Sequence, residues 1–239
     1  MIDYLNYGKQ VHSIPKEPQS EIKICVPKTS HGWLEYKLNQ TELNYVWSCV
    51  NDQEVKRNSW SHNLAGNIDG SFKLEDKNDW FFNNTLTPLI NFYEQSFGKQ
   101  SKRVPIFSKE NNNYPPYCME TWWVNYQKQH EFNPPHNHEG LFSFVIWLKI
   151  PYSWKEQKKL PQFKGTKDNQ KVAGSFYFDH LTMFGKPTTT LYPLDETMEG
   201  KMLFIPANLR HGVQPFYECD EKRVSISGNL DFLFQYEKA

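Results

Sequence analysis

The sequence has no excess of either charge, no long apolar run, no repeat and few cysteines. Its 27 basic residues balance 27 acidic ones, which argues against a nucleic-acid or membrane surface maintained by bulk charge. No apolar run approaches the ~18 residues of a membrane span, and the first residues contain no apolar segment of a secretion signal. The four cysteines lie far apart without a CxxC pair, which excludes a zinc knuckle and a small disulfide framework. We therefore expect a soluble protein of the reducing cytoplasm.

Aromatic residues, by contrast, make up 16% of the 239 residues, which indicates a folded core. We expect one domain over 1–239, in which 1–110 is a supporting region. Apolar spacing predicts a strand over 21–29 and helices over 39–53 and 79–98. The first helix has Thr41 as its expected cap; the second has Asp79 as its expected cap and Gly98 as its stop.

The second part of the chain, 111–239, is expected to be a strand-rich core. Short aromatic and β-branched runs alternate there with Gly, Pro and Asn turns, and no helical pattern intervenes. This pattern favours a mainly β sandwich or barrel over a parallel α/β sheet. The expected strands cover 118–128, 141–151, 174–180, 200–207 and 222–234. A basic, polar segment at 153–173 interrupts them and is interpreted either as a solvated surface loop or as a lid over a site.

Histidines and an arginine form the candidate site. The segment "PPHNHEG" places His136 and His138 two residues apart before an apolar strand, and side chains at that spacing share one side of an extended chain. His211 follows the strand "GKMLFIPA" and its turn. Arg223 and Ser225 share one face of the next strand. Three histidine ligands on one side suit a mononuclear non-heme iron centre, and a guanidinium beside a hydroxyl suits a carboxylate.

The order of these motifs, HxH, then "GKMLFIPANLRHGVQP", then "RVSISGN", resembles the Fe(II)- and 2-oxoglutarate-dependent oxygenases. It is most similar to oxygenase-like proteins common in bacteriophage genomes, and the resemblance covers 117–235. It implies a double-stranded β-helix, a distorted jelly roll of eight core strands with helices packed on one side. The implied cofactors are Fe(II), the co-substrate 2-oxoglutarate and O2.

Residue by residue, the resemblance makes His136 and His211 iron ligands. It makes Arg223 the partner of the far carboxylate of 2-oxoglutarate and Ser225 its hydroxyl partner. The usual second iron ligand is an Asp or Glu, whereas this chain has His138. We favour His138 as the third ligand because its spacing from His136 is right.

Three alternatives to that ligand stay open. Glu139 or Asp179 could supply a carboxylate, or the position could be unfilled. Tyr126 is a further candidate for the co-substrate pocket, with its neighbour Asn125 as the alternative; the two lie on opposite faces of one strand, and the sequence does not show which face points inward. Asn229, six residues after Arg223, has the same parity as Arg223 and is a weaker candidate for the same interior.

The function expected from these residues is a dioxygenase that hydroxylates or demethylates a small molecule or a side chain. No catalytic residue beyond the metal ligands is assigned. A cupin-like metal-binding protein is the first alternative, and a non-catalytic phage protein with a degenerate site is the second. Arg223 separates the oxygenase from the cupin, since a generic cupin has no need for a carboxylate clamp.

Overall fold

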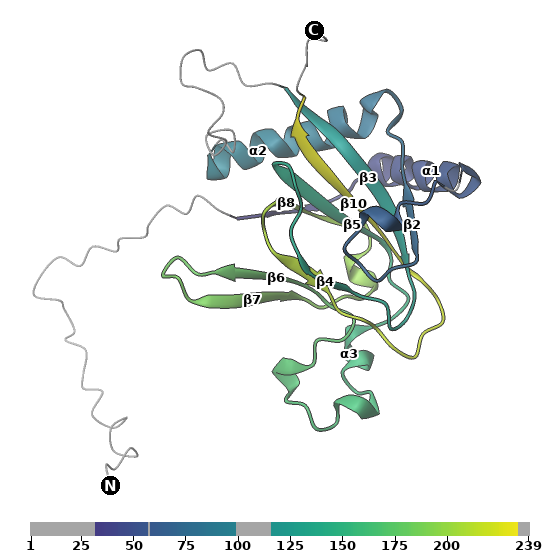
Figure 1. The fold of residues 1–239 in the computed structure, drawn as a ribbon, viewed down its shortest axis with the longest axis vertical. Coiled ribbons are helices and arrows are strands. Elements are labelled where there is room, and N and C mark those ends of the chain that lie inside the picture. Colours follow the sequence, from purple (N-terminus) through teal and green to yellow (C-terminus); the bar gives the residue numbers. More distant parts are fainter. Residues whose placement is uncertain (1–31, 57, 99–115, 234–239) are drawn as a thin grey trace, which may run out of the picture.

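The structure is a computed structural model that describes residues 32–56, 58–98 and 116–233 (Figure 1). The strand expected over 21–29 lies outside these residues. The α-helices are α1 (Gln40–Lys56), α2 (Thr87–Phe97), preceded by a π-helical turn (Phe82–Leu86), and the short α3 (Trp154–Gln157). The strands are β1 (Leu34–Lys37), β2 (Gly70–Lys73), β3 (Tyr117–Gln127), β4 (Asn133–His136), β5 (Phe142–Lys149), β6 (Phe176–Leu181), β7 (Pro187–Tyr192), β8 (Lys201–Pro206), β9 (His211–Val213) and β10 (Arg223–Phe232). No helix of the described part is long and apolar enough to cross a membrane.

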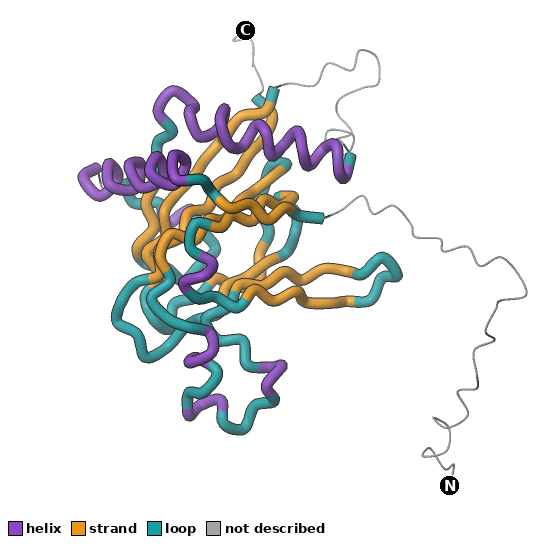
Figure 2. The backbone as a smooth tube through the Cα atoms, turned by 180° about the vertical axis from the view of Figure 1, so that it is seen from behind, coloured by secondary structure: helices purple, strands orange, loops and turns teal. Residues whose placement is uncertain are grey.

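The strands form two antiparallel sheets that face each other. The larger sheet has the order β1-β8-β5-β10-β3-β2, and the smaller has the order β4-β9-β6-β7. Strands β3 to β10 divide equally between the two sheets, as in a jelly roll of eight core strands. The mainly β, double-stranded β-helix predicted from the sequence is therefore confirmed. Figure 2 shows the β6–β7 hairpin of the smaller sheet projecting beyond the rest of the sandwich.

Alternate residues of the larger sheet face two different environments. On β5, Phe144 and Ile146 pack toward the helices, while Val145 and Trp147 pack toward the smaller sheet. This strand is buried on both faces, which explains why its sequence is a continuous apolar run rather than an alternating one. Polar side chains of β3 and β10 line the space between the two sheets.

Helices α1 and α2 cover the outer face of the larger sheet, on the side away from the smaller sheet (Figure 1). The N-terminus of α1 is closed by a capping box, because Asn39 Oδ1 accepts from Glu42 N at 3.0 Å and Glu42 Oε2 accepts from Asn39 N at 2.8 Å. Thr41 is thus not the cap. Helix α2 ends at Gly98 as predicted, with a φ of +87° that favours glycine.

The segment before the π-helical turn also differs from the prediction. The Asp76 carboxylate accepts from the backbone N–H groups of Phe81 and Phe82 at 3.0 and 2.9 Å, so Asp76 rather than Asp79 closes this end.

Candidate metal centre

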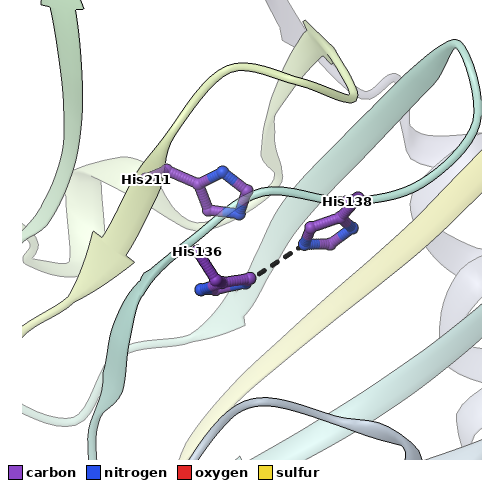
Figure 3. Close-up of side chains that lie close together, drawn as sticks. All are labelled: His136, His138 and His211. Atoms are coloured by element: carbon purple, nitrogen blue, oxygen red, sulfur yellow. Dashed lines mark hydrogen bonds between the residues drawn. The ribbon is translucent and has the colours of Figure 1, made fainter.

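Three histidines meet at one end of the space between the sheets (Figure 3). His136 ends β4 and His211 begins β9, and the two residues are directly paired across these strands. His138 lies in the turn after β4, and its backbone N–H donates to Ala207 O at 2.8 Å. One ligand atom from each imidazole lies within 4.8 Å of the other two. The structure therefore brings together the three histidines that the sequence singled out.

No carboxylate belongs to this group among the described residues. Asp179 accepts a hydrogen bond from Thr189 Oγ1 at 2.7 Å within the β6–β7 hairpin. Glu139 is exposed and lines the cavity beside the histidines without joining the ligand group. The alternatives in which Asp179 or Glu139 replaces His138 are thus not supported by the geometry.

Backbone carbonyls fix the tautomers of His136 and His211. His136 Nδ1 lies 2.7 Å from Pro134 O, and His211 Nδ1 lies 2.8 Å from Leu209 O. A carbonyl oxygen only accepts, so the proton is assigned to Nδ1 in both rings. Each Nε2 then carries a lone pair, the form in which an imidazole binds a metal.

His138 has the same tautomer, because its Nδ1 lies 2.5 Å from Asn229 Oδ1. Its Nε2 lies 3.2 Å from Nε2 of His136, the contact that Figure 3 draws as a dashed line. With both protons on Nδ1, two lone pairs face each other across this distance, and a cation between them would remove the repulsion. The donor set fits a transition-metal ion of the Fe(II) kind.

Protonation does not supply that cation near neutral pH. Burial lowers the pKa of His138 to about 4 and that of His211 to about 3, and burial also lowers the pKa of His136. The low-dielectric surroundings disfavour imidazolium. All three rings are therefore neutral and ready to bind a metal.

A cavity of about 330 Å³ extends from the histidines along the inner face of the larger sheet. This volume is at the small end of the range for ligand pockets. Arg223 lines the same cavity and is only 2% exposed. Its Nη1 donates to Tyr152 Oη at 2.6 Å and its Nη2 donates to Gln127 Oε1. Its Nε, although buried, has no hydrogen-bond partner.

No carboxylate neutralises Arg223 among the described residues. The nearby acids have other partners, since Glu221 pairs with Lys149 at 2.7 Å and Asp220 accepts from Gln129 at 2.9 Å. Burial raises the pKa of Tyr152, so this phenol is neutral beside the guanidinium. A buried cation with only neutral partners is costly. The inner end of the cavity is therefore suited to an anion.

The remaining predicted site residues lie on both faces of the larger sheet, some toward the cavity and one toward the helices. Ser225 is buried and lines the cavity, as its parity with Arg223 predicts. Asn229 also lines the cavity, but it contacts His138. Tyr126 faces away and packs against Phe72 with ring centroids 6.0 Å apart. Of the two neighbours, Asn125 and not Tyr126 therefore lines the cavity.

Gln127 and Tyr152 support the site, and neither was singled out from the sequence. Asn125 and Gln127 face the cavity on either side of Tyr126. Strand parity could have found Gln127 once Asn125 was placed inside. Tyr152 comes from a loop after β5, and no sequence pattern connects it with Arg223.

The basic segment 153–173 packs away from the cavity, and none of its residues lines it. Gln157 is buried and bonds to the backbone of Tyr217, donating to its O at 2.8 Å and accepting from its N at 2.9 Å. The interpretation of this segment as a lid over the site is not supported, because none of its residues reaches the cavity.

Comparisons with known proteins found one matching family model and several similar solved structures. The model of the family described as "Putative 2OG-Fe(II) oxygenase" matches residues 121–229, a span that contains the three histidines and Arg223. No curated protein matches the chain. SnoK, a non-heme α-ketoglutarate-dependent carbocyclase of nogalamycin biosynthesis, is a similar solved structure, with a TM-score of 0.50 and 9% identity over 84% of this chain and 80% of that one.

Two prolyl hydroxylases are also similar in structure. The prolyl-4-hydroxylase of Pseudomonas putida has a TM-score of 0.48 and 12% identity, covering 85% of this chain and 94% of that one. The prolyl hydroxylase of Trichoplax adhaerens, solved with a hypoxia inducible factor peptide, has a TM-score of 0.46 and 12% identity, covering 84% and 83%. The likeness to SnoK supports the fold, and the match over 121–229 makes the strand-rich part of this chain similar to the 2OG-Fe(II) oxygenase family.

Proposed function

We propose that the protein is an Fe(II)- and 2-oxoglutarate-dependent dioxygenase that hydroxylates or demethylates a small molecule or a side chain. One observation carries this proposal: three imidazole lone pairs and an uncompensated guanidinium, 2% exposed, line the same cavity. The first arrangement suits a divalent metal ion and the second suits a carboxylate. A ligand that bridges them must bind a metal at one end and carry a negative charge at the other, as 2-oxoglutarate does.

The residues of the chain have distinct roles in this proposal. His136, His138 and His211 hold Fe(II) through Nε2. When bound, the metal and its co-substrate supply the oxidation of an unactivated C–H bond by O2, with 2-oxoglutarate converted to succinate and CO2. Arg223 binds the far carboxylate of 2-oxoglutarate, with its free Nε–H as one donor, and Ser225 adds a hydroxyl. The enclosing strands exclude water from the bound pair.

Two other functions fit the site less well. A cupin-like metal protein would use the histidines, but it gives no reason to bury Arg223 without a counter-ion. A phage protein with a degenerate site would not need a hydrogen-bond acceptor at Nδ1 of each of the three histidines. Both observations favour the oxygenase.

Anaerobic addition of 2-oxoglutarate to the Fe(II)-loaded protein tests the proposal. The chelate should produce a weak charge-transfer absorption in the visible range. The band should be absent from His211→Ala and present in His180→Ala, a matched control whose histidine bonds to Thr190 outside the metal centre. Iron-loaded wild-type protein without the band, or a full band in His211→Ala, would contradict the proposal.

A further inference from the structure

His138 is held differently from the other two histidines of the centre. His136 and His211 each donate from Nδ1 to a carbonyl of their own segment, two residues earlier in the chain. His138 instead uses side chains of the opposite sheet. Its Nδ1 lies 2.5 Å from Asn229 Oδ1 and 3.0 Å from Ser143 Oγ. The histidine that stands where a carboxylate is expected thus has two side-chain partners from the larger sheet.

These partners belong to the central strands of the larger sheet. Asn229 on β10 is paired directly with Ser143 on β5. Trp123 of β3 stacks on the His138 ring at a centroid distance of 5.9 Å and an interplanar angle of 25°. His138 itself lies outside the strands, in the segment after β4, where a side chain without such contacts would have more rotamers available. The rigid sheet therefore sets the orientation of the third imidazole.

The hydrogen positions leave one arrangement for His138. The single proton of Ser143 Oγ faces Gly228 O at 2.8 Å and Asn229 Oδ1 at 3.2 Å, both of which are acceptors. The lone pairs of Ser143 Oγ thus remain for His138. Because an amide oxygen and a hydroxyl oxygen both accept at Nδ1, this nitrogen carries the proton and Nε2 is left for the metal.

We propose that Asn229 and Ser143 are positioning residues that make His138 the third metal ligand, so that the centre is held by three neutral imidazoles. This inference deepens the proposed function, but it concerns metal binding alone. Outer-sphere partners of this kind orient the ligand and raise its basicity. An amide does so without adding a charge.

Mn(II) titration of the full chain, followed by the EPR signal of the free ion, tests the proposal. Asn229→Leu preserves the shape of the side chain and removes the acceptor, and the Kd for Mn(II) should rise about 10- to 100-fold. Asn229→Asp keeps an acceptor and should bind Mn(II) at least as tightly as the wild type. The matched control is Asn83→Leu, an exposed asparagine on the π-helical turn, which should leave the Kd unchanged.

A double-mutant cycle separates positioning from a general loss of structure. If Asn229 acts only through His138, then Asn229→Leu should have no further effect in a His138→Ala background. Equal losses in both backgrounds, or a wild-type Kd for Asn229→Leu alone, would overturn the proposal. A wild-type Kd for His138→Ala would do the same. Ser143→Ala, with a smaller change in volume, provides a second variant that should weaken binding in the His138 background only.

The outcome is independent of 2-oxoglutarate. If the cycle gives the expected coupling while the charge-transfer band is missing, the proposed oxygenase function is refuted and the three-histidine centre is supported. If the band forms but the cycle shows no coupling, the oxygenase function is supported and the positioning role of Asn229 and Ser143 is refuted.

Discussion

Replacement of Arg223 by methionine should strongly reduce the response of the protein to 2-oxoglutarate. The change keeps an unbranched stem and removes a guanidinium that is 2% exposed. Truncating one partner of a buried charged hydrogen-bonded pair costs about 2–5 kcal/mol of binding. At 1.4 kcal/mol for each factor of ten, the Kd for 2-oxoglutarate should rise between about 30-fold and several thousand-fold.

The stability of the free protein should change much less than the affinity. Arg223→Met leaves Gln127 Oε1 and Tyr152 Oη without their donor, which costs about 1–3 kcal/mol for a buried group. Removing a buried cation that has no counter-ion offsets this loss. The variant should therefore fold, and its defect should show only in ligand binding.

Thermal unfolding with Mn(II) present and O2 excluded measures both effects. At a 2-oxoglutarate concentration of ~100 Kd, the wild type should gain ~2.7 kcal/mol, which corresponds to about 5–10 °C in Tm for a chain of this size. A Kd raised 30-fold leaves under ~1 kcal/mol of that gain. Arg210→Met is the matched control, since Arg210 is exposed and does not line the cavity. A full Tm shift in Arg223→Met would refute the carboxylate assignment.

Two further predictions concern the stability of the protein without metal or ligand. The pKa values of about 4 for His138 and about 3 for His211 in the folded protein lie below the ordinary value of 6.5. The unfolded protein therefore binds more protons, and each histidine should lower the free energy of unfolding by about 2 kcal/mol as the pH falls from 7 to 5. Urea unfolding should show this pH dependence in the wild type. It should not show it in the double variant His138→Gln/His211→Gln. Gly140→Ala should destabilise the protein by at least ~1 kcal/mol, because Gly140 has a φ of +85° and an added Cβ would lie 2.7 Å from Leu230 O. Thermal unfolding with no change in Tm would contradict the second expectation.

The sequence predicted the strands that carry most of the core and missed those without an apolar pattern. β5 and β8 are apolar runs between turn residues, which makes them readable. β4 contains two consecutive prolines and pairs with β9 at only a few residues, and β7, with the sequence PTTTLY, is polar and lies at a sheet edge. Strands of this kind form because a neighbour offers hydrogen bonds, and a single segment does not reveal its neighbour.

The candidate site likewise contains residues that the sequence could predict and residues whose role depends on neighbouring segments. The order of the motifs singled out three histidines and an arginine, and the structure places all four along one cavity. Strand parity placed Asn125 and Tyr126 on opposite faces of β3, but the choice between the faces depends on what covers each one. Both faces of β3 are covered, one by the helices and Phe72 and the other by the cavity wall, so neither polarity nor parity could decide.

If the protein binds a metal ion and 2-oxoglutarate as proposed, the charges of the cavity predict that the two bind cooperatively. Three neutral imidazoles contribute no negative charge, so a divalent ion and the Arg223 guanidinium would together place three positive charges along one cavity, whose acidic lining residues, Glu120 and Glu139, are both exposed. The dianion of 2-oxoglutarate removes two of them, and the repulsion between the metal and the guanidinium falls when it binds. A carboxylate in place of His138 would have reduced this dependence.

We therefore expect the Kd for Mn(II) to fall by about 5- to 150-fold when 2-oxoglutarate is present. The Kd for 2-oxoglutarate should fall by the same factor when Mn(II) is present, as reciprocity requires. Independent binding of the two ligands would mean that they do not share this cavity.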